Sequence, residues 1–239
     1  MATELEMLFD EINKFDYYPA NIKRISGDIP ESIFFPGGQG IFSKVPGSIS
    51  DKEIMVVGDQ FNYNLNMNKA HGLKKNRLKI SPAWSNLLLL CIYGNIDPEK
   101  CFFTNTLLGV AIPNKTGKKP SEYTRNYFTE HCKKIFQKEL EIQKPKLILV
   151  LGLKAARFLS IFHPDLQGWS NIRSLNKVDQ QGLTIIRNVP LTETSTTTLV
   201  LLTHPIGRHA NIASRKFGKY SGNKAEIEML LHINQKQNS

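Results

Sequence analysis

Four short apolar segments recur along the chain at long intervals, and they constrain the fold more than any other feature. The segments are Ile54–Val57, Cys101–Thr104, Leu147–Leu151 and Leu199–Thr203. Each is continuously apolar rather than alternating, which is typical of strands buried on both faces of a sheet. Helical patterns separate them, at residues 84–93, 121–142 and 153–162. Alternating strands and helices predict a three-layer α/β/α fold around a mostly parallel sheet of about four strands.

The composition fits a single domain over residues 1–239. The hydrophobic content of 41% is enough for one well-buried core. Residues 3–14 carry apolar side chains at helical spacing, with Leu5, Leu8, Phe9 and Ile12 on one side. We therefore expect residues 1–30 to form an N-terminal helical extension.

Three further stretches carry weaker signals. Residues 171–198 are polar and rich in Thr, which predicts a loop and one more strand around Leu183–Val189. The glycine-rich stretch 34–42 lacks the strand–loop–helix frame of a phosphate-binding loop, which favours a plain turn. Residues 234–239 are expected to form a frayed tail.

Several protein classes are disfavoured. The apolar runs are too short to span a bilayer, and the acidic N-terminus lacks the apolar stretch of a signal peptide, so we expect a cytoplasmic protein. The three cysteines, Cys91, Cys101 and Cys132, are widely spaced and odd in number. This pattern argues against a disulfide framework or a zinc site and predicts reduced, buried thiols.

Polar residues follow each apolar run, where the carboxyl end of a strand is expected. They are Asp59, Gln60 and Asn62 after the first run, Asn105 after the second, Gly152 and Lys154 after the third, and His204 after the fourth. In an open parallel sheet, ligands bind at this edge. Singly, these side chains have structural explanations, such as turn capping or a buried histidine. Their convergence on one edge favours a functional site.

Positive charge gathers just downstream of three of these strand ends. The net charge is +10, and the segments 69–79, 114–120 and 206–220 hold 12 of the 31 Lys and Arg but none of the 21 Asp and Glu. A solvated surface normally mixes its signs. This segregation favours a binding face for a polyanion.

Four motifs, in this order, resemble those of the uracil-DNA glycosylase superfamily, most closely the branch whose members often carry an iron–sulfur cluster. IFFPGGQGIF followed by IMVVGDQFN resembles its glycine-rich lead-in and G-E-A-P-G loop, and CFFTNTLLGVAIPN its "TN…P…N" strand and loop. KPKLILVLGLKAARFL resembles its "P-x-x-I-x-x-L-G-x-x-A" strand and helix, and LVLLTHPIGR its closing "T-x-H-P-S" motif. The resemblance covers about Phe34 to Arg208.

The resemblance implies roles for matched positions. Asn105 falls on the asparagine that reads the flipped base, and His204 on the histidine that stabilises the departing base anion. Asp59 matches the acid in the second place of the first loop, while other branches carry the acid in the third place, where Gln60 stands. The role of Asp59, water activation or base contact, stays open.

The sequence also departs from the family pattern. Phe61 replaces the proline of the first loop, and Asn62 stands where tyrosine or glycine faces the C5 edge of the base. Ile206 replaces the serine after His-Pro. Phe61 and Trp84 are candidates for the aromatic that stacks on the base, although Trp84 also suits the core. The four cluster cysteines are not matched, so no iron–sulfur centre, metal or other cofactor is expected.

The implied partner is DNA, single- or double-stranded, bound by a monomer. The expected DNA contacts are Lys74, Lys75, Lys118, Lys119, Lys154, Arg208, His209, Arg215 and Lys216. Among them, Lys154 and the amides at the start of its helix would hold a phosphate, and Arg208 or His209 would wedge into the base stack.

Three functions remain open from the sequence. The first is a monofunctional DNA glycosylase that excises a damaged or modified pyrimidine, with uracil as the default. The second is a glycosylase acting on a hypermodified base of phage DNA, since Asn62 would offer hydrogen bonds to a polar 5-substituent. The third is a non-catalytic nucleic-acid-binding protein that retains the fold.

Overall fold

The centre of the fold is a five-stranded sheet in the order β4-β2-β6-β8-β7. The computed structural model describes residues 4–23, 53–59, 61–62, 82–111, 122–206 and 208–237. The sheet strands are β2 (Ile54–Gly58), β4 (Cys101–Asn105), β6 (Leu147–Leu151), β7 (Ile185–Thr192) and β8 (Ser195–Leu202). Within this sheet β4, β2, β6 and β8 pair in parallel, whereas β7 pairs antiparallel with β8. The predicted mostly parallel sheet is confirmed, with β7 as its additional strand.

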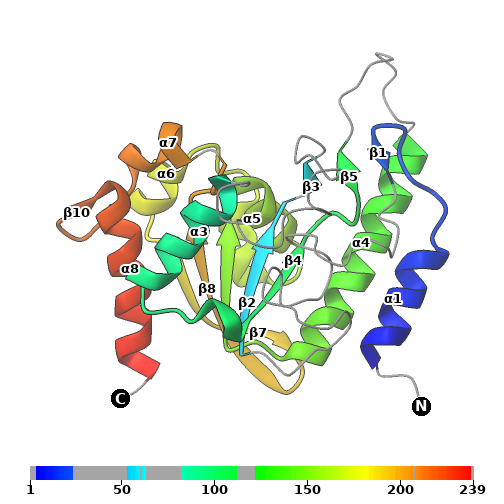
Figure 1. The fold of residues 1–239 in the computed structure, drawn as a ribbon, viewed down its shortest axis with the longest axis horizontal. Helices are drawn as coiled ribbons and strands as arrows, with labels where there is room; N and C mark the ends of the chain where they lie inside the picture. Colours follow the sequence, from blue (N-terminus) through cyan, green and yellow to red (C-terminus); the bar gives the residue numbers. More distant parts are fainter. Residues whose placement is uncertain are drawn as a thin grey trace, which may run out of the picture.

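The parallel strands end nearly level with one another. Gly58 of β2 is the register partner of Asn105 of β4, and Leu151 of β6 is the partner of Leu202 of β8. The residues that follow these positions therefore emerge along one edge of the sheet, which is the upper edge in Figure 1. This is the edge at which ligands bind in open parallel sheets.

Helices cover both faces of the sheet (Figure 1). They include α3 (Pro82–Tyr93), α4 (Glu122–Gln143), α5 (Leu153–Leu159), α6 (Leu175–Gln180) and α8 (Gly222–Gln237). Met55 and Val57 pack into the apolar cluster shared with α4, α5 and α6, while Val56 between them packs into the cluster shared with α3 and α8. Both faces of β2 are thus buried, as its continuous apolar run predicted. The three-layer α/β/α architecture is confirmed.

Short elements complete the described chain. They are β1 (Ile22–Lys23), β3 (Phe61–Asn62), β5 (Val110–Ala111), β9 (Lys216–Phe217), β10 (Tyr220–Ser221), α7 (Arg208–Asn211) and the 3-10 turns η3 (Pro98–Lys100), η4 (Pro164–Trp169) and η5 (Ile212–Ser214). β1, β5 and β3 form a small second sheet, and β9 and β10 form a hairpin. The hairpin joins α7 and η5 to α8.

The N-terminal helix α1 (Glu4–Lys14) packs against α4 rather than against the sheet (Figure 1). Leu8 and Ile12 of α1 are buried together with Phe128 and Ile135 of α4. Phe15, which follows α1, stacks on His131 of α4 with ring centroids 3.9 Å apart. The helix expected over residues 3–14 is present, and Leu8 and Ile12 of its apolar stripe pack against α4.

The C-terminal third departs most from the sequence-based expectation. β8 starts at Ser195 instead of Leu199, because its Thr-rich first half pairs with β7 and needs no apolar run. The expected strand near Leu183–Val189 is longer and runs from Ile185 to Thr192. α8 continues through Gln237, where we expected fraying from residue 234. Asn234 anchors it by donating to the backbone oxygens of Gly94 and Asn95 (2.9 and 3.1 Å).

The three cysteines are free and buried, as the sequence predicted. Cys91 lies on α3, Cys101 begins β4 and Cys132 lies on α4. Burial raises the pKa of the Cys91 and Cys132 thiols to about 12. Both thiols are therefore protonated at neutral pH.

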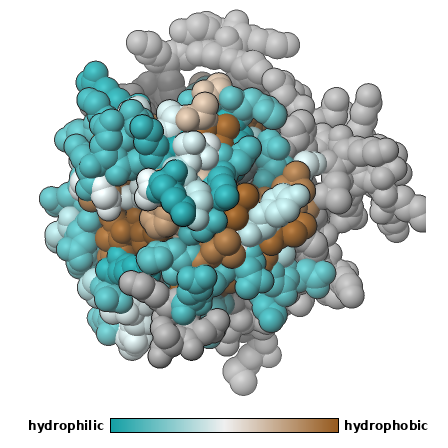
Figure 2. All heavy atoms as spheres, turned by 90° about the vertical axis from the view of Figure 1, so that its left-hand side faces the viewer, coloured by the Kyte–Doolittle hydropathy of each residue, from teal (hydrophilic) through white to brown (hydrophobic). Residues whose placement is uncertain are grey.

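The surface on the α8 side of the molecule is mixed in character. Figure 2 shows that hydrophilic side chains predominate there and that hydrophobic ones reach the surface in separate patches. On α3, Leu89, Ile92 and Tyr93 are exposed, whereas Trp84 and Leu87 are buried in the core. No helix in the described part of the chain is long and apolar enough to cross a membrane.

Candidate active site

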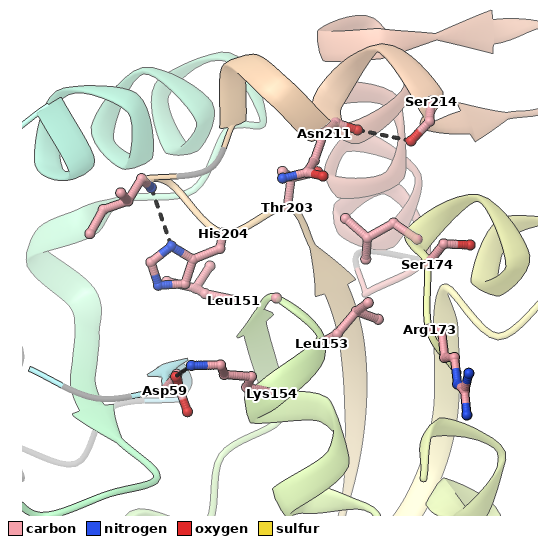
Figure 3. Close-up of a pocket in the computed structure, with 13 residues that line it drawn as sticks. Asp59, Leu151, Leu153, Lys154, Arg173, Ser174, Thr203, His204, Asn211 and Ser214 are labelled. Carbon is pink, nitrogen blue, oxygen red and sulfur yellow. Dashed lines mark hydrogen bonds and ion pairs between the residues drawn. The ribbon is translucent and has the colours of Figure 1, made fainter. Parts of the chain in front are cut away.

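A pocket of about 510 Å³ opens at the carboxyl edge of the sheet. Its walls come from segments far apart in the sequence (Figure 3). The lining residues are Asp59 after β2, Leu151–Lys154 between β6 and α5, Arg173–Leu175 at the start of α6, Thr203, His204 and Ile206 after β8, and Asn211 and Ser214 near α7. The structure thus brings Asp59, Lys154 and His204 into one cavity.

His204 is held in one tautomer by its own loop. The backbone N–H of Ile206 donates to its Nδ1 at 3.2 Å. With Nδ1 accepting, the proton of a neutral imidazole resides on Nε2. Figure 3 shows the ring above Asp59 and Lys154, with the accepting nitrogen on the side away from them. Nε2 is therefore left as the hydrogen-bond donor of this ring.

Burial lowers the pKa of His204 from its usual 6.5. The nearby carboxylate of Asp59 acts in the opposite direction, and the ammonium of Lys154 lowers the pKa further. The net direction is downward, so the imidazole is neutral at neutral pH. A neutral ring that donates from Nε2 can stabilise negative charge on a ligand through a hydrogen bond.

Gly152 allows the end of β8 to approach the start of α5. Its φ of +88° lies in the region that favours glycine, and its N–H donates to the oxygen of Leu202 (2.9 Å). A Cβ atom at this position would lie 3.0 Å from the Cβ of His204. The glycine therefore sets the position of His204 through close packing.

Asp59 and Lys154 form an ion pair of 3.1 Å in the pocket, visible in Figure 3. The Asp59 side chain is 14% exposed and the Lys154 side chain 68%. The Asp59 backbone oxygen accepts from the N–H of Leu107 (3.0 Å) and the hydroxyl of Thr106 (2.8 Å). The loop after β4 thus fixes the backbone of Asp59. Lys154 pairs with the Asp59 carboxylate while most of its side chain stays exposed to solvent.

Asn105 lies near this pocket without being one of its described lining residues. It ends β4, opposite Gly58 in the register, and is 4% exposed. The next residue, Thr106, donates its N–H to the oxygen of Gly58 (3.0 Å). Asn105 is therefore level with Gly58, the residue that precedes Asp59. Because β4 lies beyond β2 in the sheet, Asn105 is one strand further from His204 than Asp59 is.

Two expected DNA contacts are wrong. The Arg208 side chain is 10% exposed, pairs with Glu226 of α8 at 2.5 Å and donates to Asn223 (3.0 Å). Arg215 is completely buried between Asp179 (3.2 Å) and Glu226 (3.4 Å). Buried guanidinium groups that are paired in this way cannot grip a phosphate or wedge into a base stack. The acids that neutralise them lie outside the acid-free segment 206–220.

The structure describes some of the other expected site residues, and the rest lie outside its described part. His209 and Lys216 are exposed, and Trp84 is buried against Phe103 with ring centroids 4.9 Å apart, so Trp84 belongs to the core. Gln60, Lys74, Lys75, Lys118 and Lys119 lie outside the described residues, as does the glycine-rich stretch 34–42. The backbones of Phe61 and Asn62 form β3, but their side chains lie outside the described part.

Sequence reasoning missed several polar lining residues. Arg173, Ser174, Asn211 and Ser214 carry no motif, and they reach the pocket through the packing of α6 and α7. Ile206, which replaces the serine after His-Pro, is 55% exposed and lines the pocket, and no pattern in the sequence predicts this exposure. Within the described ranges, no group of three or more His, Cys, Asp or Glu is arranged to hold a metal ion.

Comparison with protein families agrees with the fold. The family model of the uracil DNA glycosylase superfamily matches residues 48–221. This match covers most of the chain, so the protein belongs to the uracil-DNA glycosylase superfamily. Among curated proteins, none matches the chain. Family membership supports a glycosylase-type hydrolase that acts on DNA.

The electrostatics of the pocket can be tested by titrating His204. NMR of the ring protons should give a midpoint below 6.5 in the wild-type protein. Lys154→Met should raise the pKa, because it removes a nearby positive charge, and Asp59→Asn should lower it by removing a negative one. Shifts of the same sign in both variants would contradict the arrangement described here.

Proposed function

We propose that the protein is a DNA glycosylase that extrudes one nucleotide and hydrolyses its N-glycosidic bond, leaving an abasic site. Uracil is the default base. The observation that carries the proposal is a pocket at the carboxyl edge of the sheet in which His204, with Nε2 as donor, lies above the carboxylate of Asp59. This arrangement suits a reaction that separates charge between a base and a sugar.

His204 would act on the leaving base. As the glycosidic bond breaks, negative charge develops on the base and positive charge on the deoxyribose. The Nε2–H of a neutral His204 would donate to the developing oxyanion in a partly desolvated pocket. A fixed donor of this kind typically contributes about 3–4 kcal/mol to transition-state stabilisation.

Asp59 would act on the sugar side. A carboxylate can offset the cationic character of the deoxyribose or position the attacking water. The ion pair with Lys154 orients the Asp59 side chain, and the bonds from Thr106 and Leu107 fix its backbone. Asn105, which falls on the family's base-reading asparagine, would pair with the Watson–Crick edge of the base.

Ile206 replaces Arg208 as the candidate wedge. It is apolar, 55% exposed, two residues beyond His204 and on the wall of the pocket. Flipping a base out of a duplex costs a few kcal/mol, and an apolar side chain that fills the vacated space offsets part of that cost. The exposed His209 and Lys216 are then available for the phosphate backbone.

The central test measures abasic-site formation in a uracil-containing oligonucleotide. His204→Ala and Asn105→Ala should each lower the single-turnover rate by about 100-fold or more, which corresponds to the loss of a transition-state hydrogen bond. Both variants should keep the wild-type thermal midpoint and affinity for DNA. Wild-type turnover in both variants would refute the assignment. Salt-dependent DNA binding without base release from any substrate would favour a non-catalytic binding protein.

The wedge can be tested separately with Ile206→Ala. On duplex uracil DNA the rate should fall by roughly tenfold, about 1.4 kcal/mol, because part of the gain from burying the side chain is lost. On single-stranded DNA, where no partner strand must be displaced, the rate should change little. Ile161→Ala is a matched control, since Ile161 is 52% exposed and lies outside the pocket. Equal loss on both substrates would argue against the wedge.

A hypermodified base is a second candidate substrate. The pocket continues beyond His204 to the polar side chains of Ser174, Asn211 and Ser214 (Figure 3). Its volume of about 510 Å³ leaves room for a polar substituent on the base. A glycosylase acting on modified phage DNA would need such an extension, because pocket shape and exocyclic contacts set substrate choice.

The substrate can be assigned with a panel of oligonucleotides that contain uracil, thymine or glucosylated hydroxymethylcytosine. Mass spectrometry would identify the released base. If the polar extension binds a substituent, Asn211→Ala should lower release of the glucosylated base by about tenfold, the value of one hydrogen bond. It should leave uracil release unchanged. An equal effect on both bases would exclude a role specific to the substituent.

A further inference from the structure

We propose that Glu226 is a positioning residue that holds the loop carrying His204, a role that rests on the proposed glycosylase function. Glu226 lies on α8, which follows the last of the family motifs in the sequence. It is completely buried and does not line the pocket. It would affect the reaction indirectly, by holding in place the loop between Thr203 and Arg208.

The two oxygens of the Glu226 carboxylate hold opposite ends of this loop. Oε1 accepts from both the backbone N–H of Thr203 (2.6 Å) and its hydroxyl (2.7 Å). Oε2 accepts from Nη1 of Arg208 (2.5 Å). His204 and Ile206 lie between these two attachment points. One carboxylate therefore fixes the span of chain that carries the proposed oxyanion donor and wedge.

The carboxylate is itself held by buried charge. Arg215, with no exposed surface, places its Nε 3.4 Å from Oε1 and donates to the backbone oxygen of Leu201 (2.8 Å). Electrostatic interactions are strong where water is excluded, so removal of one partner leaves the other charge costly to bury. Glu226 is thus restricted to the orientation that reaches Thr203.

The loop has one further anchor, from the other helix on this face. The side-chain amide of Asn86 on α3 donates to the oxygen of Pro205 (3.0 Å). Together with the bond from the Ile206 N–H to Nδ1 of His204, this contact leaves the loop little freedom. Loss of the Thr203 attachment would let the chain shift directly before His204. A misplacement of about 1 Å near a reacting group can lower a rate by about 100-fold.

Asp179 provides a matched control within the same network. It accepts from Arg215 (3.2 Å), from the Thr184 hydroxyl (2.7 Å) and from the N–H of Lys216 (2.7 Å). Its side chain is 2% exposed, close to the 0% of Glu226, but among the described residues it makes no hydrogen bond to the loop of His204. A purely structural role predicts similar consequences for both acids, whereas a positioning role predicts that they differ.

The experiment compares Glu226→Gln, Asp179→Asn, Thr203→Val and Thr203→Ser. The readouts are the single-turnover rate of base release at saturating enzyme, the dissociation constant for abasic product DNA, and the thermal midpoint. Glu226→Gln and Thr203→Val should lower the rate by about 10- to 100-fold with little change in DNA affinity. Thr203→Ser, which keeps the hydroxyl, should restore it. Asp179→Asn should lose thermal stability but keep its rate.

Rates that follow the thermal midpoint across all four variants, or a wild-type rate in Glu226→Gln, would overturn the proposal. If Glu226→Gln does not fold, the Thr203→Val and Thr203→Ser pair decides. Failure of the glycosylase assignment is distinguishable, because the wild-type protein would then release no base. In that case the imidazole ¹⁵N shifts of His204 decide, since Thr203→Val should weaken the Nδ1 hydrogen bond that Thr203→Ser keeps.

Discussion

The in-register pairing of four parallel strands is the constraint on which the site depends. Gly58 lies opposite Asn105, and Leu151 opposite Leu202, so the residues after these positions emerge side by side. Each strand is short and buried on both faces, which leaves little freedom to shift the register without exposing apolar side chains. Asp59, Lys154 and His204 meet because the core fixes where their strands stop, although long stretches of sequence separate them.

A second constraint comes from buried charge behind the pocket. Sequence alone suggests that segment 206–220 offers all its positive charge to a polyanion. In the structure, Glu226 and Asp179 neutralise Arg208 and Arg215, which leaves Lys216 and Lys219 as the exposed cationic side chains of this segment. The same pairs tie α6, α7 and α8 to the end of β8. Arg208 and Arg215, which the sequence suggests as DNA contacts, instead form ion pairs that hold the structure behind the pocket.

The parts of the fold that sequence could predict are those with a local signature. Continuous apolar runs predicted the bounds of β2, β4 and β6 to within one residue. A strand that is buried on both faces carries apolar side chains at successive positions, and this pattern is visible in the sequence alone. The start of β8 was not predicted, because the first half of this strand consists of Ser and Thr and contains no apolar run. The hydrogen bonds between Glu226 and Thr203, and the position of Asn211 in the pocket wall, could not be predicted from the sequence either. They arise from contacts between segments whose own sequences carry no motif.

The burial of the three cysteines has a practical consequence for following the protein in solution. Thiolates, not thiols, react with alkylating reagents, and these thiols combine burial with, for Cys91 and Cys132, a pKa of about 12. The native chain is thus suited to site-specific labelling without prior removal of its cysteines. A single cysteine introduced at an exposed position, for example by His209→Cys, would accept a fluorophore selectively. Its emission could then report each encounter with a nucleic acid as it happens.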